Sequence, residues 1–125
     1  MLLALGAWLD GYFAGKIKDR PDIPLMMNGS KFQIAVWNGL GRIPYGKTIS
    51  YAALAALIGY DGDAARHQAR AVGAAVARNP CSILLPCHRV LGARGQLTGY
   101  AGGLERKEAL LDLEKAEYGL TLHIL

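Results

Sequence analysis

Charge is scarce in this chain of 125 residues, and so are cysteine and long apolar runs. Only 19% of the residues are charged whereas 52% are hydrophobic, a composition that excludes a disordered chain. The length suits one domain with a single core. Two cysteines, Cys81 and Cys87, are too few for a disulfide framework, so we expect a reducing, cytoplasmic compartment, such as a bacterial cytosol or nucleoid.

No stretch of the sequence has the length and apolar composition of a membrane span. The first five residues are apolar, but Asp10 and Lys16 interrupt the run too early. We therefore expect no membrane contact. A net charge of +4 and an isoelectric point of about 9.2 are compatible with a nucleic-acid partner, although many basic domains bind none.

Apolar spacing and capping residues predict a mostly helical α+β fold with a few short strands. Ser30 and Ser50 each precede an apolar-periodic run and can cap a helix. A break at residues 59–62 separates two short helices, as in a helix-turn-helix of the winged-helix type. The predicted helices are 2–14, ended by Gly15, then 30–40, 51–58, 63–78 and 104–117, with extended pieces at 48–49 and 81–85.

The last predicted helix separates into two faces. Its apolar residues are Leu104, Ala109, Leu110 and Leu113, which we expect to be buried. We expect the charged run Glu105, Arg106, Lys107 and Glu108 to be solvated. Residues 120–125 are interpreted as a final strand or a packed tail.

The stretch Leu84–Val90 places Cys87, His88 and Arg89 behind a proline and between two apolar runs. Such flanks predict buried, extended backbone around the polar residues. A thiol becomes a strong nucleophile as thiolate, and a neighbouring imidazole can act as its base. The alternative is a small, inert core cysteine, and chemistry alone leaves both interpretations open.

A zinc site is the other chemistry that cysteine and histidine suggest. The possible soft ligands are His67, Cys81, Cys87 and His88, without any Cys-x-x-Cys pair. Adjacent cysteine and histidine make a poor chelate, so we expect no metal.

The segment Pro86-Cys87-His88-Arg89-Val90 resembles the active-site signature of the O6-alkylguanine-DNA alkyltransferases, also called methylated-DNA–protein-cysteine methyltransferases. The flanking segments 43–46, 49–51, 70–73, 78–80 and 99–104 resemble the family's in the same order. The resemblance implies a variable amino-terminal domain, which we expect to be missing here. We therefore divide the chain into a helix with connector (1–28) and a DNA-binding, catalytic domain (29–125).

The resemblance implies that Cys87 takes the alkyl group and that His88, through a water, removes the thiol proton. Glu114 would orient His88, although the sequence alone favours an ordinary surface acid. Asn79 would brace the turn between the DNA-reading helix and the active site, and Tyr51 would assist at the flipped nucleotide. No cofactor is implied, because the lesion donates the alkyl group and the protein accepts it.

The resemblance also implies the partner, which is double-stranded DNA that carries an alkylated guanine, with an alkylated thymine as the alternative lesion. The protein would bind the minor groove as a monomer. The resemblance makes Arg70 the residue inserted into the base stack, with Arg66 as its rival. The DNA-facing set is Ser50, Tyr51, Arg70, Ala71 and Gly73, and the substrate-pocket set is Val90, Tyr100 and Ala101. Compared with the compact family members, this chain carries a few extra residues at 60–67. The sequence therefore does not determine where the second helix begins or the angle at which it meets DNA.

Two other functions are alternatives to DNA repair by alkyl transfer. Alkyltransferase-like proteins lack the nucleophile, bind the flipped base and recruit other repair factors, but this chain has Cys87. A general redox or hydrolytic cysteine–histidine enzyme would have no need of the DNA-reading flanks. The expected function is therefore single-turnover DNA repair, a suicidal methyltransferase reaction.

Overall fold

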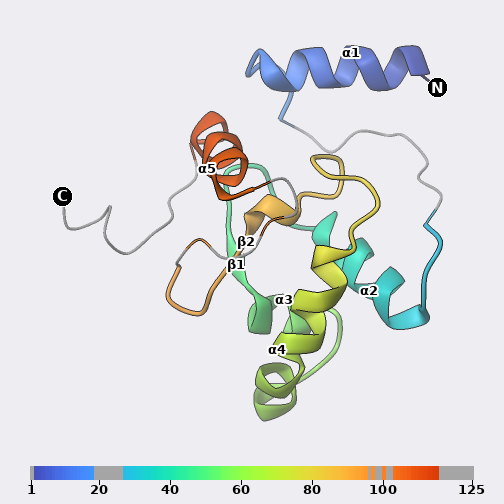
Figure 1. The fold of residues 1–125 in the computed structure, drawn as a ribbon, viewed down its shortest axis with the longest axis vertical. Helices are drawn as coiled ribbons and strands as arrows, with labels where there is room; N and C mark the ends of the chain where they lie inside the picture. The colour runs from blue at the N-terminus through green and yellow to red at the C-terminus, as the bar shows by residue number, and fades with distance from the viewer. Residues whose placement is uncertain (1, 19–26, 96, 98–99, 101–102, 116–125) are drawn as a thin grey trace.

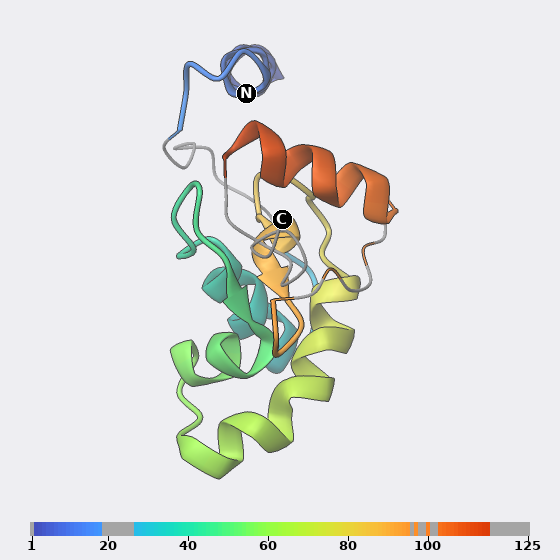
Figure 2. The ribbon, with the colours of Figure 1, turned by 90° about the vertical axis from the view of Figure 1, so that its left-hand side faces the viewer.

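The computed structural model describes residues 2–18, 27–95, 97, 100 and 103–115. α1 and α5 lie at one end of the molecule and α2, α3 and α4 at the other, with two short strands between them (Figure 1, Figure 2). The predicted α+β fold, mostly helical, is confirmed. In chain order the elements are α1 (Leu2–Phe13), α2 (Lys31–Leu40), β1 (Ile49–Ser50), α3 (Tyr51–Leu57), α4 (Gly62–Ala77), the 3₁₀ turn η1 (Cys87–Arg89), β2 (Val90–Leu91) and α5 (Leu104–Leu113).

The helix starts after Ser30 and Ser50 are where their capping residues predict them. The Ser30 hydroxyl accepts from the Gln33 backbone N–H at 3.1 Å, and the Gln33 side chain accepts from the Ser30 N–H at 3.0 Å. This reciprocal pair is a capping box. The Ser50 hydroxyl accepts from the Ala53 N–H at 3.0 Å. Within the described residues, no helix is long and apolar enough to cross a membrane.

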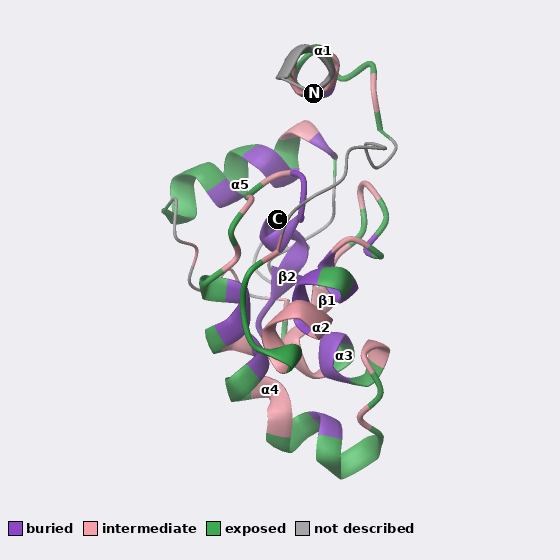
Figure 3. Cartoon of the chain, turned by 90° about the vertical axis from the view of Figure 1, so that its right-hand side faces the viewer, coloured by how far each residue is buried: buried purple, intermediate pink, exposed green. Residues whose placement is uncertain are grey.

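The core lies where α2, α3 and α4 meet. Trp37 is buried and its indole N–H donates to the Ala75 carbonyl at 2.9 Å, which joins α2 to α4. α4 begins at Gly62, one residue before the predicted start. The extra residues therefore form the break after α3 and the first turns of α4, whose outer face is exposed (Figure 3).

The two strands pair in parallel over only two residues each. Ile49 lies opposite Val90, and Ser50 lies opposite Leu91. Because β1 leads directly into α3 and β2 follows η1, this pairing places the start of α3 beside the Cys87–Arg89 turn.

The predicted extended piece at residues 81–85 is wrong. The chain forms consecutive turns there, Ser82 is exposed, and Ile83 has a φ of +75°. The Leu85 N–H donates to the Cys81 carbonyl at 3.0 Å, which closes the turn. Leucines 84 and 85 are buried as expected, so their apolar character reports burial and not strand geometry.

The predicted faces of the last helix are also wrong in part. Lys107, expected in solvent, is fully buried, whereas Leu104 is 48% exposed and Ala109 is exposed. α5 ends at Leu113, four residues early, and the chain turns at Lys115 with a φ of +56°. The predicted final strand or tail lies outside the described residues.

The capping box gives a direct test of the fold. We expect Ser30→Ala to lower the free energy of unfolding by about 1 kcal/mol, because the Gln33 N–H loses its acceptor. Urea denaturation followed by circular dichroism measures the loss. Lys31→Ala is the control, because Lys31 is the next residue and its side chain is exposed. Its free energy of unfolding should stay within about 0.5 kcal/mol of the parent value. Equal losses in the two variants would contradict the capping argument.

Candidate active site around Cys87

Cys87 lies in a tight turn that shields it from solvent. Its N–H donates to the Leu85 carbonyl at 2.7 Å, and the Arg89 N–H donates to the Pro86 carbonyl at 3.0 Å. In this 3₁₀ turn the side chains of Cys87 and His88 no longer point to opposite faces of a strand. The turn implied by the resemblance is present, and the extended backbone predicted from the apolar flanks is not. Cys87 is 6% exposed.

His88 and Glu114 form the pair that the resemblance implied. His88 Nε2 lies 2.6 Å from Glu114 Oε2, and both side chains are fully buried. Glu114 directly follows the last residue of α5 as its C-cap, so the end of this helix places the carboxylate next to His88 of η1. The other ring nitrogen, His88 Nδ1, is buried and has no hydrogen-bond partner among the described residues.

The Glu114 carboxylate also receives donors that the sequence did not indicate. Arg89 donates from Nε to Oε1 at 2.7 Å and from Nη2 to Oε2 at 2.9 Å, a two-pronged contact. The Tyr12 hydroxyl, from α1, donates to Oε2 at 2.5 Å. The Gly46 N–H donates to Oε1 at 3.3 Å. A single carboxylate thus joins α1, the turn at Gly46, η1 and α5.

These contacts determine the charge states in the cluster. Burial raises the pKa of Glu114, but hydrogen bonds from His88, Arg89 and Tyr12 outweigh burial and lower it to about 2. Glu114 is therefore ionised at neutral pH, and His88 Nε2 carries the hydrogen between the two groups. Burial lowers the pKa of His88 below its ordinary value, although Glu114 opposes this shift. A neutral His88 then presents the lone pair of Nδ1 as its proton acceptor.

Asn79 braces the loop between α4 and η1, which is the geometry that the resemblance implied. Its side-chain NH₂ donates to the Leu85 carbonyl at 2.7 Å, and its oxygen accepts from the Cys81 N–H at 2.9 Å. Both bonds hold the turn that leads to Cys87. The second cysteine, Cys81, is half-buried, and burial raises the pKa of its thiol.

Lys107 and Tyr100 flank Cys87. The Lys107 ammonium donates to the Val90 carbonyl at 2.7 Å, and burial lowers its pKa to about 8. The Tyr100 hydroxyl interacts with Cys87 and Ser82, and burial followed by the Cys87 charge raises its pKa to about 12. Val90 is buried in the core, and Ala101 lies outside the described residues.

The predicted DNA-facing residues lie on the neighbouring helix pair. Tyr51 begins α3 and its ring packs near Gly73 of α4. Arg70 and Ala71 are exposed on α4. Arg66, one turn earlier, is also exposed but forms an ion pair with Asp63 on its own helix. Ser50 caps α3 beside β2, so this group adjoins the cysteine turn.

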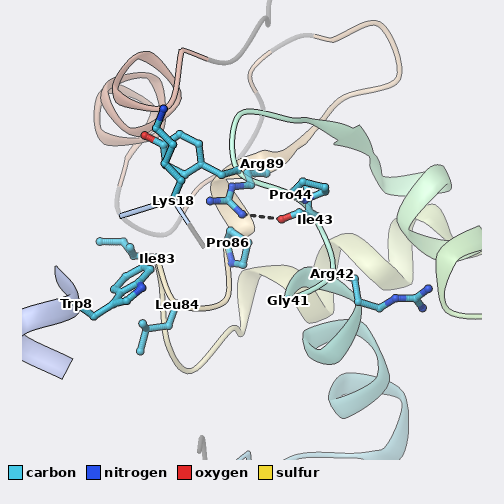
Figure 4. A pocket seen from close by; sticks show the side chains of 11 residues that line it. Trp8, Lys18, Gly41, Arg42, Ile43, Pro44, Ile83, Leu84, Pro86 and Arg89 are labelled. Atoms are coloured by element: carbon cyan, nitrogen blue, oxygen red, sulfur yellow. Dashed lines mark hydrogen bonds between the residues drawn. The ribbon is translucent and has the colours of Figure 1, made fainter. Parts of the chain in front are cut away.

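Two cavities lie close to these residues. One, of about 370 Å³, lies between α1 and the core and includes Trp8, Tyr45 and Arg89 but not Cys87 (Figure 4). In this view Arg89 also donates to the Ile43 carbonyl at 2.7 Å. The other, of about 380 Å³, is mostly apolar and is lined by Phe13, Ser82, Ile83, Tyr100, Arg106, Ala109 and Leu110. Over the described part of the chain, no three His, Cys, Asp or Glu side chains group as metal ligands.

Three buried polar residues of this cluster, Tyr12, Arg89 and Lys107, had no functional role in the sequence analysis. The burial of Lys107 could have been predicted from helical spacing. If Glu114 points inward, positions 107, 110 and 111 lie on the same face of the helix. Tyr12 carried no such signal, because its ring fits an apolar stripe equally well. Its partner is 102 positions away in the chain.

Comparisons with known proteins show which family this chain belongs to. Residues 31–116 match the family model described as 6-O-methylguanine DNA methyltransferase, DNA binding domain. A methylated-DNA–protein-cysteine methyltransferase of Mycobacterium tuberculosis is 51% identical over 108 residues, 86% of this chain and 62% of its own length. The inducible enzyme of that name from Bacillus subtilis is 50% identical over 104 residues, 83% of this chain and 55% of its own.

Solved structures give the same result. The crystal structure of M. tuberculosis OGT in complex with DNA superposes with a TM-score of 0.83 and 47% identity, covering 96% of this chain and 71% of that one. S. pombe Atl1 in complex with damaged DNA containing O6-carboxymethylguanine superposes with a TM-score of 0.56 and 31% identity, covering 77% and 87%. The chain spans less than two thirds of the length of the curated relatives named above. On the match to the family model and on these identities, it belongs to the O6-methylguanine-DNA methyltransferase family.

Proposed function

We propose that this chain repairs alkylated DNA by transferring the alkyl group from O6 of guanine to the sulfur of its own Cys87. The observation that carries the proposal is the buried pair of Glu114 and His88, the latter in the same turn as Cys87, in which an ionised Glu114 fixes the His88 hydrogen on Nε2. Nδ1 is then the nitrogen that accepts a proton. Family membership supports the same chemistry.

In the proposed reaction the thiol proton of Cys87 passes through a water to His88 Nδ1. The sulfur attacks the alkyl carbon in line, so that an S–C bond forms as the C–O bond to guanine breaks. The departing guanine takes a proton from the Tyr51 hydroxyl, with a backbone N–H as the alternative donor to its oxygen. A thioether has no easy reverse route, so each molecule acts once and no cofactor takes part.

DNA is the proposed partner, bound as a duplex through its minor groove. Small residues make this approach possible, since Ala71 is exposed on α4 and Gly73 presents no side chain. Arg70 would enter the base stack and replace the flipped nucleotide, at an extrusion cost of a few kcal/mol that is least for a damaged base. Ser50 and Tyr51 would contact the backbone near the same step. We propose a monomer acting in the cytoplasm.

The apolar cavity beside Tyr100 is the proposed place for the flipped base. The Tyr100 hydroxyl interacts with Cys87, so a base lying against Tyr100 would have its O6 substituent near the sulfur. A largely apolar cavity lining suits a purine base. Val90 lies directly after the cysteine turn and supports the pocket from within the core.

A lesion-binding module without chemistry is the second candidate function. The similarity to S. pombe Atl1, at 31% identity, favours it to a degree. The cysteine itself favours transfer, because a module that only binds has no use for a buried thiol beside a histidine–carboxylate pair.

Intact-mass measurement separates these two functions. After incubation with a duplex containing O6-methylguanine, we expect the protein to gain one methyl group, about 14 Da, on Cys87. Cys81 is the internal control, because it is the second free thiol of the chain and burial raises its pKa. Cys87→Ser should still bind the duplex but gain no mass, since a hydroxyl stays protonated where a thiol ionises. An adduct on Cys81, or none on folded protein, would overturn the proposed transfer.

A second prediction concerns base extrusion. We expect Arg70→Ala to slow transfer from duplex DNA at least tenfold, because the space left by the flipped nucleotide is no longer filled. Transfer from the free modified base should change little, since it needs no extrusion. Arg66→Ala is the matched control, an arginine one turn earlier whose side chain pairs with Asp63. If Arg66→Ala shows the selective loss instead, Arg66 is the inserted residue.

A further inference from the structure

Tyr12 reaches the centre of the candidate site from outside the family's DNA-binding domain. The family model begins at residue 31, and Tyr12 belongs to α1. Its side chain is fully buried, and its hydroxyl donates to Glu114 Oε2 at 2.5 Å. The same oxygen lies 2.6 Å from His88 Nε2. Tyr12 and His88 therefore share one carboxylate oxygen.

Aromatic contacts hold the Tyr12 ring in this position. Trp8, one turn earlier on α1, stacks on it with ring centroids 5.3 Å apart and planes inclined by 18°. Tyr45 meets it edge-on at 6.1 Å. The Arg89 guanidinium lies over the Tyr45 ring, 5.6 Å from the ring centre. Because these contacts restrict rotation of the Tyr12 ring, they hold its hydroxyl in the position that bonds to Glu114.

The charge around His88 gives this contact a chemical consequence. A carboxylate facing a buried imidazole favours the imidazolium, which cannot accept the thiol proton. Each additional donor to the carboxylate takes up part of its negative charge and weakens that preference. Besides each other, His88 and Glu114 interact with Lys107 from α5, Arg89 from η1, Tyr12 from α1 and Tyr45 from the turn before β1. Cys87 precedes His88 in η1.

We propose that Tyr12 is a positioning residue of the transfer reaction, which fixes Glu114 Oε2 and shares its charge so that His88 remains a neutral base. This inference rests on the proposed function of Cys87 and His88. It makes α1 a part of the proton relay, because the hydroxyl that completes the carboxylate's set of donors comes from that helix. Tyr12 acts through its hydrogen bond to Glu114.

The test is the pH profile of single-turnover methyl transfer in Tyr12→Phe, which keeps the ring and removes the hydroxyl. Without that donor, Glu114 Oε2 attracts the His88 proton more strongly, so the pKa of His88 should rise. Transfer requires neutral His88, so the acid limb of the profile should move up by about 0.5 to 1 pH unit. At a fixed pH on that limb the rate falls about three- to tenfold, and on the alkaline plateau it stays within about twofold.

Tyr45→Phe is the matched control. It removes a neighbouring hydroxyl whose hydrogen bond, at 3.3 Å, goes to the Leu113 carbonyl and not to the carboxylate. Its acid limb should coincide with that of the parent. If Tyr12→Phe lowers the melting temperature but leaves the limb in place, or moves the limb to lower pH, Tyr12 is a packing residue and the proposal is wrong.

Imidazole ¹⁵N NMR titration of His88 keeps this test separate from the proposed function. A parent protein that takes up no methyl group would overturn the transfer reaction, yet its His88 still titrates. We expect a higher His88 pKa in Tyr12→Phe than in the parent and in Tyr45→Phe. An unchanged pKa overturns the role of Tyr12, whatever the protein does with DNA.

Discussion

The buried carboxylate of Glu114 is the interaction on which the rest of the site depends. A carboxylate removed from water is costly unless cations and hydrogen-bond donors replace the lost hydration. Here the replacement comes from Arg89, His88 and Tyr12, with a longer contact from the Gly46 N–H. Removing one partner of a buried ion pair commonly costs 3–5 kcal/mol, on the order of half of a domain's stability. The groups that orient His88 therefore also hold α1, η1 and α5 together.

Two short connections link the helix pair to this cluster. β1 and β2 pair over two residues each, which places Ser50 beside Leu91 and so brings the start of α3 to the cysteine turn. Asn79 bonds the loop after α4 at two points, one of them the Leu85 carbonyl just before Pro86. The helix proposed to contact DNA and the thiol proposed as nucleophile are thus separated by a few hydrogen-bonded residues. Such rigid links suit chemistry in which an extruded base must arrive within about 3–3.5 Å of a nucleophile.

Local signals predicted the parts of this fold that are set locally. Ser30 and Ser50 begin helices because a hydroxyl can satisfy a free backbone N–H within the first turn, a property of a few adjacent residues. The turns at 81–85 depend instead on Asn79, whose bonds override the apolar character of the segment. The register of α5 likewise depends on tertiary contacts, because Lys107 is stabilised by the Val90 carbonyl, which the helix sequence does not reveal.

The candidate site was predictable to the same extent. Cys87 and His88 lie in the segment that resembles the family's signature, and Asn79 lies in a flanking segment that resembles the family's. Glu114 was placed by that resemblance and not by its helix. The role of Tyr12 was not predicted, because a tyrosine in an apolar stripe can contribute its ring to packing or its hydroxyl to a hydrogen bond. Only the fold shows that the hydroxyl bonds to Glu114. Arg89 was recognised as polar and enclosed, but its partner is 25 positions away.

The charges enclosed with the thiol favour one protonation state of the histidine. Arg89 and Lys107 are buried cations, and Glu114 is the only buried carboxylate among the described residues. Glu114 bonds to Arg89, whereas Lys107 donates to the Val90 carbonyl. Adding a proton to His88 would place another positive charge in a cluster whose single carboxylate is already bonded to a guanidinium. Burial lowers the pKa of His88 in the same direction. In the proposed reaction a neutral imidazole bonded to an ionised carboxylate accepts the thiol proton, and these buried contacts favour that state of His88 in the protein itself.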